Sequence, residues 1–249
     1  METLFCPNCR EEVRPRVVKT PTFVGTVIVE EYCPKCGLML GRRVEELKLP
    51  TRKVTRKGLY IAIEGISGSG KTLQARRLVD RLRREGYEAL YVKEPYVKAI
   101  KEFLYKHRVD PDVEAYLFAA DRIILQTEVV LPALEEGKVV VSDRSVYSSL
   151  AFQVARGVPE EFVLALNRSI RRPDLVILLD LPVSQALERI RDREVLTRFD
   201  ERSLLERVRA RYLELAKTYD FKIIDASMSP DEVAESIWRI AKERLAGHS

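Results

Sequence analysis

One stretch of eight residues has the composition and spacing of a phosphate-binding loop. Residues 65–72 fit the pattern G-x-x-x-x-G-K-[ST], follow the apolar run Leu59–Glu64 and open a helical stretch. Glycines let successive backbone N–H groups point at phosphate oxygens, and the next helix adds its positive dipole end. We expect Lys71 to reach the β- and γ-phosphates of ATP and the Thr72 hydroxyl to bind Mg²⁺. The expected ATP-binding residues are Gly65, Ile66, Ser67, Gly68, Ser69, Gly70, Lys71 and Thr72.

The four cysteines form a second chemically distinctive set. Two residues separate Cys6 from Cys9, two separate Cys33 from Cys36, and 23 residues lie between the pairs. Four thiolates in two such pairs are typical of a closed, tetrahedral structural zinc site. A β-rich run with an internal glycine, residues 22–29, lies between the pairs. We therefore predict a small zinc ribbon that needs structural Zn²⁺ to fold.

An adjacent acid and base follow another apolar run. Asp143 comes directly after the predicted strand Lys138–Ser142, at the strand end where ligands of open α/β sheets bind. A carboxylate there can hold Mg²⁺ directly or through water, and Arg144 can pair bidentately with a phosphate. The alternative interpretation of these two residues is a surface ion pair.

Several segments, in order, resemble those of the thymidylate kinase family. Residues 143–153, DRSVYSSLAFQ, are similar to its D-R-Y-x-x-S-S-L-A-Y-Q segment, and residues 117–122, LFAADR, resemble its signature at the start of a long helix. The resemblance covers about residues 58–249 and implies a P-loop kinase that uses ATP with Mg²⁺ and is commonly a homodimer. The remaining matching segments are 173–180, 186–190, 198–200 and 211–216.

The resemblance also implies roles on the acceptor side. Phe118 is expected to stack on the nucleobase, and Arg122, four residues later on the same helix face, to reach a base carbonyl or the phosphate. Ser149 is expected to bind the base edge, and Phe152 to lie near the sugar. Glu94 is retained after the second strand and is expected to help position Mg²⁺ or the acceptor. From the sequence pattern alone, core packing is the alternative for both phenylalanines.

A group of arginines is predicted to form a lid. Arg189, Arg191, Arg193 and Arg198 lie between one amphipathic stretch and the next. Arginines that close over a transferred phosphoryl group stabilise its charge and exclude water. Because the phosphate loop has Ser69 and no arginine, the resemblance implies a catalytic arginine from this lid, namely Arg191, Arg193 or Arg198.

The chain departs from the family pattern on the acceptor side. Ser67 replaces an acid of the loop, Ser145 replaces the tyrosine of Asp-Arg-Tyr, and an E-P-G-G-T-like segment is reduced to residues 93–96, KEPY. The favoured function is phosphorylation of a pyrimidine nucleoside monophosphate, dTMP to dTDP above all. The departures leave open a divergent kinase for another nucleotide or a nucleic-acid 5′ end, and a non-catalytic nucleotide-binding regulator.

Apolar runs alternate with amphipathic stretches from residue 58 onward. The runs 59–64, 89–92, 139–141, 175–179 and 222–224 alternate with the stretches 112–136, 146–155, 160–171, 183–191, 201–219 and 230–245. This alternation predicts a P-loop-type parallel α/β sheet flanked by helices. We expect residues 1–57 to form the zinc ribbon and a basic linker, and residues 58–249 the kinase domain.

Composition limits the remaining possibilities. Residues 1–57 hold 12 Lys and Arg against 7 Asp and Glu, whereas residues 58–249 hold 31 of each. This excess is a weak footprint for nucleic acid, and the favoured alternative is a solvated basic linker. A zinc ribbon could also contact nucleic acid or a protein. The chain has no apolar run of about 18 residues that would span a membrane and no signal pattern, so we expect a cytoplasmic protein. The abundance of Glu, Lys and Arg resembles that of proteins from hot environments.

Overall fold

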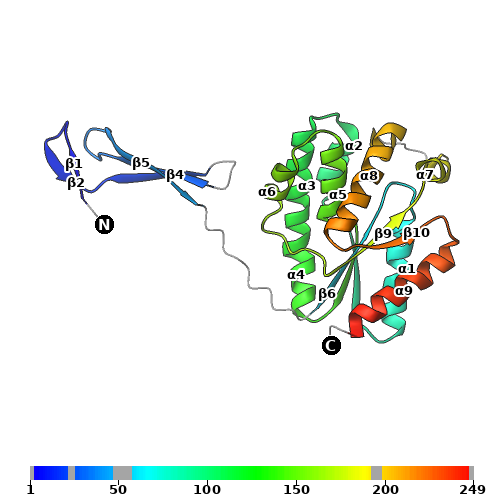
Figure 1. Cartoon of the computed structure of the whole chain (residues 1–249). Helices are drawn as coiled ribbons and strands as arrows, with labels where there is room; N and C mark the ends of the chain where they lie inside the picture. Colours follow the sequence, from blue (N-terminus) through cyan, green and yellow to red (C-terminus); the bar gives the residue numbers. More distant parts are fainter. Residues whose placement is uncertain (1–2, 22–25, 47–57, 192–197, 247–249) are drawn as a thin grey trace. The chain divides into compact units, whose positions relative to one another are not determined.

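The computed structural model describes residues 3–21, 26–46, 58–191 and 198–246. The chain divides into two compact units, Met1–Arg52 and Lys53–Ser249 (Figure 1). Each unit has a buried core of its own. No helix within the described ranges is both long enough and apolar enough to cross a membrane.

The first unit consists of antiparallel strands. β1 (Leu4–Cys6) pairs with β2 (Glu11–Val13), while β3 (Arg16–Pro21), β4 (Thr26–Tyr32) and β5 (Met39–Glu46) form a three-stranded sheet. The strand predicted at residues 22–29 overlaps β4, and its first four residues lie outside the described ranges. The basic segment 41–57 is predicted to be a linker or a short basic strand; its first six residues belong to β5, and residues 47–57 are likewise not described.

A five-stranded parallel sheet forms the centre of the second unit, as predicted. Its order is β10-β9-β6-β8-β7. Every residue of β6 and β8 is buried, which explains why these strands read as nearly continuous apolar runs. The strands are β6 (Leu59–Glu64), β7 (Ala89–Lys93), β8 (Val139–Asp143), β9 (Leu175–Asp180) and β10 (Lys222–Asp225).

Helices cover both faces of this sheet. α1 (Lys71–Arg84) and α9 (Pro230–Ala246) pack together on one face, and α3 (Pro111–Leu125), α5 (Val146–Ala155) and α8 (Arg202–Thr218) lie side by side on the other (Figure 1). The shorter helices are α2 (Lys98–Lys106), α4 (Leu131–Glu135), α6 (Glu160–Leu166) and α7 (Val183–Ile190), with a π-helical turn η1 (Gln126–Val130) and a 3₁₀ turn η2 (Arg198–Asp200).

Two features differ from the predicted pattern. The single stretch expected over residues 112–136 contains the π-helical turn η1, where the Gln126 side chain exchanges two hydrogen bonds of 2.7 and 2.8 Å with the backbone of Arg171. The sequence reasoning also missed α2, which has nine residues and no side-chain cap at its start. The π-helical turn depends on a contact with distant Arg171, which amphipathic periodicity does not contain, whereas α2 is amphipathic but short.

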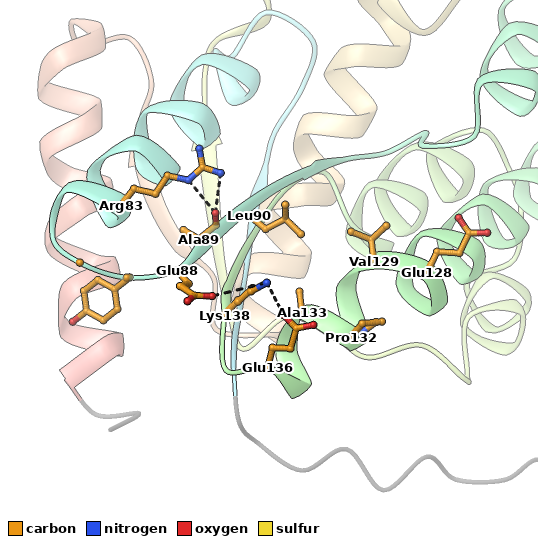
Figure 2. A pocket seen from close by; sticks show the side chains of 12 residues that line it. Arg83, Glu88, Ala89, Leu90, Glu128, Val129, Pro132, Ala133, Glu136 and Lys138 are labelled. Atoms are coloured by element: carbon orange, nitrogen blue, oxygen red, sulfur yellow. Dashed lines mark hydrogen bonds and ion pairs between the residues drawn. The ribbon is translucent and has the colours of Figure 1, made fainter.

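β7 is an edge strand, and its start is covered by a side chain. The Ala89 carbonyl points away from β8 and accepts hydrogen bonds of 3.1 and 3.0 Å from Arg83 Nε and Nη2 (Figure 2). Beside it lies an open cavity of about 640 Å³ with an apolar floor that includes Leu90 and Val129. Lys138 forms ion pairs with Glu88 and Glu136 at its rim. This cavity lies at the amino ends of β7 and β8, the end of the sheet opposite the phosphate loop.

Candidate active site

One cavity of about 920 Å³ opens at the carboxyl ends of β6, β7 and β8. It brings together the phosphate loop and residues that the sequence analysis assigned to the acceptor. Of the predicted site residues, those lining it are Ser67, Gly68, Gly70, Lys71, Thr72, Glu94, Phe118, Arg122, Asp143, Arg144, Ser149 and Phe152.

The phosphate loop turns sharply between β6 and α1. Gly65, Gly68 and Gly70 have φ values of 144°, 86° and 90°, which favour glycine. A Cβ on Gly68 would lie 2.5 Å from the Ala186 carbonyl oxygen, so a larger residue would also clash. Gly70 caps α1 without a side chain, which leaves the first N–H groups of the helix for phosphate oxygens.

Lys71 is held inside the loop. It is 6% exposed, and its Nζ donates to the Ile66 carbonyl at 2.7 Å and to Ser69 Oγ at 3.4 Å. Burial, followed by the nearby Arg144, lowers the pKa of Lys71 to about 7, although Asp143 and Glu64 oppose the shift. The Lys71 ammonium therefore has too little negative charge beside it to offset its burial, and the phosphates of ATP would supply that charge.

This shift predicts proton uptake on ATP binding. At pH 8 most Lys71 is neutral, and phosphate oxygens beside it raise its pKa again, so the protein should take up close to one proton per ATP. Below pH 7 the uptake should shrink because Lys71 already carries its proton. Titration calorimetry in two buffers of different ionisation enthalpy measures the uptake. Lys71→Arg keeps a permanent charge and should lose this uptake; equal uptake in both proteins would contradict the prediction.

Thr72 and Asp143 form a corner suited to a divalent cation. The Thr72 hydroxyl donates to Asp143 Oδ2, and Asp143 is 1% exposed. Asp143 Oδ1 is buried and has no hydrogen-bond partner within the described ranges. A hydroxyl and a carboxylate with one free oxygen fit the oxygen ligands that Mg²⁺ prefers. Burial opposes ionisation, but Lys71, Lys93 and Arg144 together hold the pKa of Asp143 below its usual value.

Arg144 is positioned by a buried hydroxyl network. It adopts a left-handed backbone with φ 83°, which costs a non-glycine residue roughly 1–2 kcal/mol. Its Nη1 donates to Ser148 Oγ at 3.2 Å, and its guanidinium lies 5.2 Å from the centre of the Phe152 ring. Ser148 and Tyr212 donate to Glu64 Oε2 at 2.7 and 2.8 Å. Glu64, fully buried at the end of β6, thereby anchors the groups that hold Arg144.

Ser145, one of the departures from the family pattern, belongs to the same network. Its hydroxyl donates to Glu64 Oε1 at 2.7 Å, and its Oγ also caps α5 by accepting from Tyr147 N. Ser145 is 1% exposed, so it acts within the protein rather than on the cavity surface.

Glu94 and Arg122 form a buried ion pair in the cavity wall. Arg122 Nε donates to both Glu94 oxygens at 3.0 Å, and Nη2 donates to Oε2 at 2.6 Å. The same guanidinium donates to Asn167 Oδ1 and to Ser149 Oγ at 2.6 and 3.0 Å. Burial, opposed by Arg122, raises the pKa of Glu94 above its usual value. Arg122 thus binds both Glu94 and Ser149 in the ligand-free protein, and the predicted ligand contacts of these three residues stay predictions.

Aromatic rings form the opposite wall. The ring of Phe199 lies 6.3 Å from the rings of both Phe118 and Phe152 in edge-on geometry. Phe118 is only partly buried and lines the cavity, while Phe152 is 6% exposed. A flat apolar slot beside Arg144 is suited to a planar base attached to a phosphate.

Comparisons with known proteins identify the family. The thymidylate kinase family model matches residues 63–237, which is more than half of the chain. A probable thymidylate kinase of Pyrococcus abyssi is 42% identical over 203 residues, covering 77% of this chain and 99% of the relative. The chain belongs to the thymidylate kinase family. A probable thymidylate kinase of Archaeoglobus fulgidus is 38% identical over 192 residues, covering 75% of this chain and 96% of the relative.

Family membership makes the chain a nucleoside monophosphate kinase. The match begins at Ile63, within β6, so the four-cysteine unit lies outside it. The relatives are matched over nearly their whole length by about three quarters of this chain. The cysteine unit is therefore an addition to the part shared with these thymidylate kinases.

Two of the four predicted lid arginines have side chains outside the described ranges. Arg191 ends α7 and is exposed, and it does not line the cavity among the described residues. Arg193 lies outside the described ranges, and so does the side chain of Arg198, whose backbone opens η2. Phe199 and Asp200, directly after Arg198, do line the cavity.

The sequence did not predict several residues of the site, among them Glu64, Lys93, Ser148, Phe199 and Tyr212. Glu64 could have been found, because a charged residue ending a buried strand directly before a phosphate loop is unusual. Lys93 and Tyr212 gave no local signal, since Lys93 is one of many lysines and Tyr212 lies 148 positions from its partner Glu64. Lys93 Nζ contacts both Thr72 Oγ1 and Asp143 Oδ2, at 3.0 and 3.1 Å.

The four cysteines of the first unit converge. Their sulfur atoms all lie within 4.8 Å of one another, with Cys6 Sγ 3.6 Å from Cys36 Sγ and Cys9 Sγ 3.8 Å from Cys33 Sγ. Tetrahedral Zn–S bonds of about 2.3 Å require sulfurs about 3.8 Å apart, so the four thiols fit zinc. Each pair is followed by a left-handed residue, Arg10 at φ 57° and Gly37 at φ 74°, which closes a tight turn.

Proposed function

We propose that this kinase transfers the γ-phosphoryl group of ATP to dTMP, yielding dTDP and ADP. The observation that supports the proposal most strongly is the single cavity shared by the phosphate loop, Arg144 and the aromatic slot. It provides a triphosphate site and a base-and-phosphate site with open space between them. The curated relatives with about 40% identity are named probable thymidylate kinases.

The transfer needs positioning and charge stabilisation rather than a covalent enzyme intermediate. An oxygen of the dTMP phosphate attacks the γ-phosphorus of ATP in line, and the bond to the β–γ bridging oxygen breaks as ADP leaves. When bound, Mg²⁺ would neutralise the charge that develops on the transferred phosphoryl group. Thr72 and Asp143 hold it, Lys71 contacts the β- and γ-phosphates, and Arg144 binds the phosphate of dTMP. Glu94 supports this site by fixing Arg122.

The base would lie in the aromatic slot. Phe118 stacks on the thymine and Phe152 borders the sugar. Arg122 and Ser149, which bind each other, also contact the base edge through polar atoms that this hydrogen bond does not use. The lid arginines Arg191, Arg193 and Arg198 complete the proposal by covering the transferred phosphoryl group.

An ATP-consumption assay tests the function directly. We expect a clear preference for dTMP over dUMP, dCMP, UMP, CMP, AMP and GMP, with an acceptor-free control near zero. If turnover is faster with another monophosphate, that nucleotide would replace dTMP as the proposed acceptor. No turnover with any of the seven would overturn the proposal and direct attention to nucleic-acid 5′ ends.

The first unit gives little support to a nucleic-acid acceptor. Of its seven basic side chains within the described ranges, four form ion pairs with glutamates of the same unit: Lys19, Lys35, Arg42 and Arg43. Neutralised cations contribute little to phosphate binding.

We further propose that Cys6, Cys9, Cys33 and Cys36 bind one structural Zn²⁺. The purified protein should contain one zinc per chain by atomic emission, and Cys9→Ser with Cys33→Ser should remove it. Because small metal units rarely fold without their ion, the first unit should then become protease-sensitive. Activity with dTMP should change less than about threefold, since the catalytic residues lie in the second unit. Full zinc content in the double variant would contradict the assignment.

We propose a homodimer that uses α3. Val113, Tyr116 and Ile123 stay exposed along this helix with near-helical spacing, at 43, 40 and 39%. Such a stripe is typical of a helix that packs against a partner. Light scattering should give twice the chain mass, and Ile123→Glu should shift it toward the monomer. A wild-type mass equal to that of a single chain would rule the dimer out.

A further inference from the structure

Lys93 occupies the corner where the divalent cation should bind. Its Nζ lies 3.0 Å from Thr72 Oγ1 and 3.1 Å from Asp143 Oδ2, so one ammonium touches both expected metal ligands. Mg²⁺ binds oxygens at about 2.0–2.1 Å. An ammonium and a divalent cation cannot share these two oxygens, because both cations would then lie within a few ångströms of each other.

The other cations of the site are not free to exchange in this way. Lys71 is buried and bound to the Ile66 carbonyl, and Arg144 is held by Ser148 over the Phe152 ring. The Lys93 side chain is 43% exposed at the end of β7, and its contacts with Thr72 and Asp143 both lie in the metal corner. It has a flexible stem and an open cavity beside it into which it can turn.

The burial of the Asp143 carboxylate explains why a cation is needed at this corner. This carboxylate is almost completely buried, and one oxygen has no hydrogen-bond partner in the described ranges. A buried carboxylate without a nearby cation is costly. Before a metal arrives, the ammonium of Lys93 lies 3.1 Å from Asp143 Oδ2 and, together with Lys71 and Arg144, offsets the charge of this carboxylate.

We propose that Lys93 is a resident counter-cation of the metal corner, which neutralises Asp143 in the nucleotide-free protein and is exchanged for Mg²⁺. This inference rests on the metal corner of the proposed kinase function but not on the identity of the acceptor. Lys93 therefore competes with Mg²⁺ and raises the metal concentration that the corner needs.

Manganese binding to the nucleotide-free protein tests the exchange without any turnover. Mn²⁺ serves as the probe, and the loss of its free paramagnetic resonance signal gives the affinity. Lys93→Met should bind Mn²⁺ at least tenfold more tightly than wild type. Lys93→Arg keeps the cation and should stay within twofold of wild type, which separates charge from side-chain removal.

Two further variants locate the effect. Lys98→Met removes an equal charge five residues away from a side chain that is 90% exposed, and it should leave Mn²⁺ affinity within twofold. Adding Asp143→Asn to Lys93→Met should abolish the gain. Equal affinity of wild type and Lys93→Met, or a gain that persists without Asp143, would overturn the proposal. Tighter Mn²⁺ binding by Lys93→Met supports the exchange even where the monophosphate assay shows no dTMP turnover.

Discussion

Lys71→Ala lowers kcat with ATP and dTMP by about 10³-fold or more, while the protein stays folded. Preorganised charges at a developing anion are worth roughly 10²–10³-fold each, and Lys71 is the loop cation that meets the β- and γ-phosphates. Its side chain is buried and its pKa is already lowered to about 7 by desolvation. Lys71 forms no direct ion pair within the described residues, so its removal takes one hydrogen bond from the Ile66 carbonyl and some positive charge from near Asp143, a smaller loss than the loss of catalysis.

Two measurements separate catalysis from folding for this variant. A coupled assay of ADP release gives kcat, and guanidinium denaturation gives the free energy of unfolding. Lys101→Ala is the matched control, because it removes an exposed lysine of α2 that lies over the Tyr105 ring and is not part of the phosphate loop. Activity of Lys71→Ala within tenfold of this control would sink the phosphate-loop assignment.

Arg122→Met lowers the free energy of unfolding by about 3–5 kcal/mol, the usual result of leaving a buried charge unpaired. Arg122 and Glu94 are 1 and 3% exposed, so water cannot replace the lost hydrogen bonds. Arg122 also binds Asn167 and Ser149, which come from other segments. The variant therefore loosens the cavity wall as well as the fold.

Guanidinium denaturation checks this second prediction against an exposed pair. Arg202→Met removes a partner of Glu206 at 3.8 Å, where both side chains are 59% exposed, and should cost less than about 1 kcal/mol. Adding Glu94→Leu to Arg122→Met should recover part of the loss, because the unpaired carboxylate is gone. A cost below 1 kcal/mol for Arg122→Met would mean that Glu94 is neutral or hydrated in the variant.

The sequence was sufficient where the chemistry is local. The phosphate loop is contiguous, so its glycines, Lys71 and Thr72 could be assigned from spacing, and the apolar runs located all five strands of the kinase sheet. The two cysteine pairs likewise predicted the cluster that the first unit forms.

Contacts between side chains that lie far apart in the sequence could not be predicted. Helical spacing puts Phe118 and Arg122 on one face of α3, but this spacing does not show that Arg122 is paired with Glu94 inside the protein. Arg122 donates hydrogen bonds to Glu94, which follows β7, and to Asn167, which follows α6. No local sequence pattern predicts these contacts. Tyr212 on α8 reaches Glu64 on β6 for the same reason, through packing of α8 against α5.

Arg83 at the edge of β7 has a consequence for behaviour at high concentration. A free strand edge offers carbonyl groups to any other extended chain, and such edges nucleate aggregation. The fork of Arg83 occupies the outward carbonyl of Ala89, and a charged rim of Glu88, Lys138 and Glu136 lies beside it. This edge is thereby closed to strand addition at its start, which favours solubility during heating and refolding.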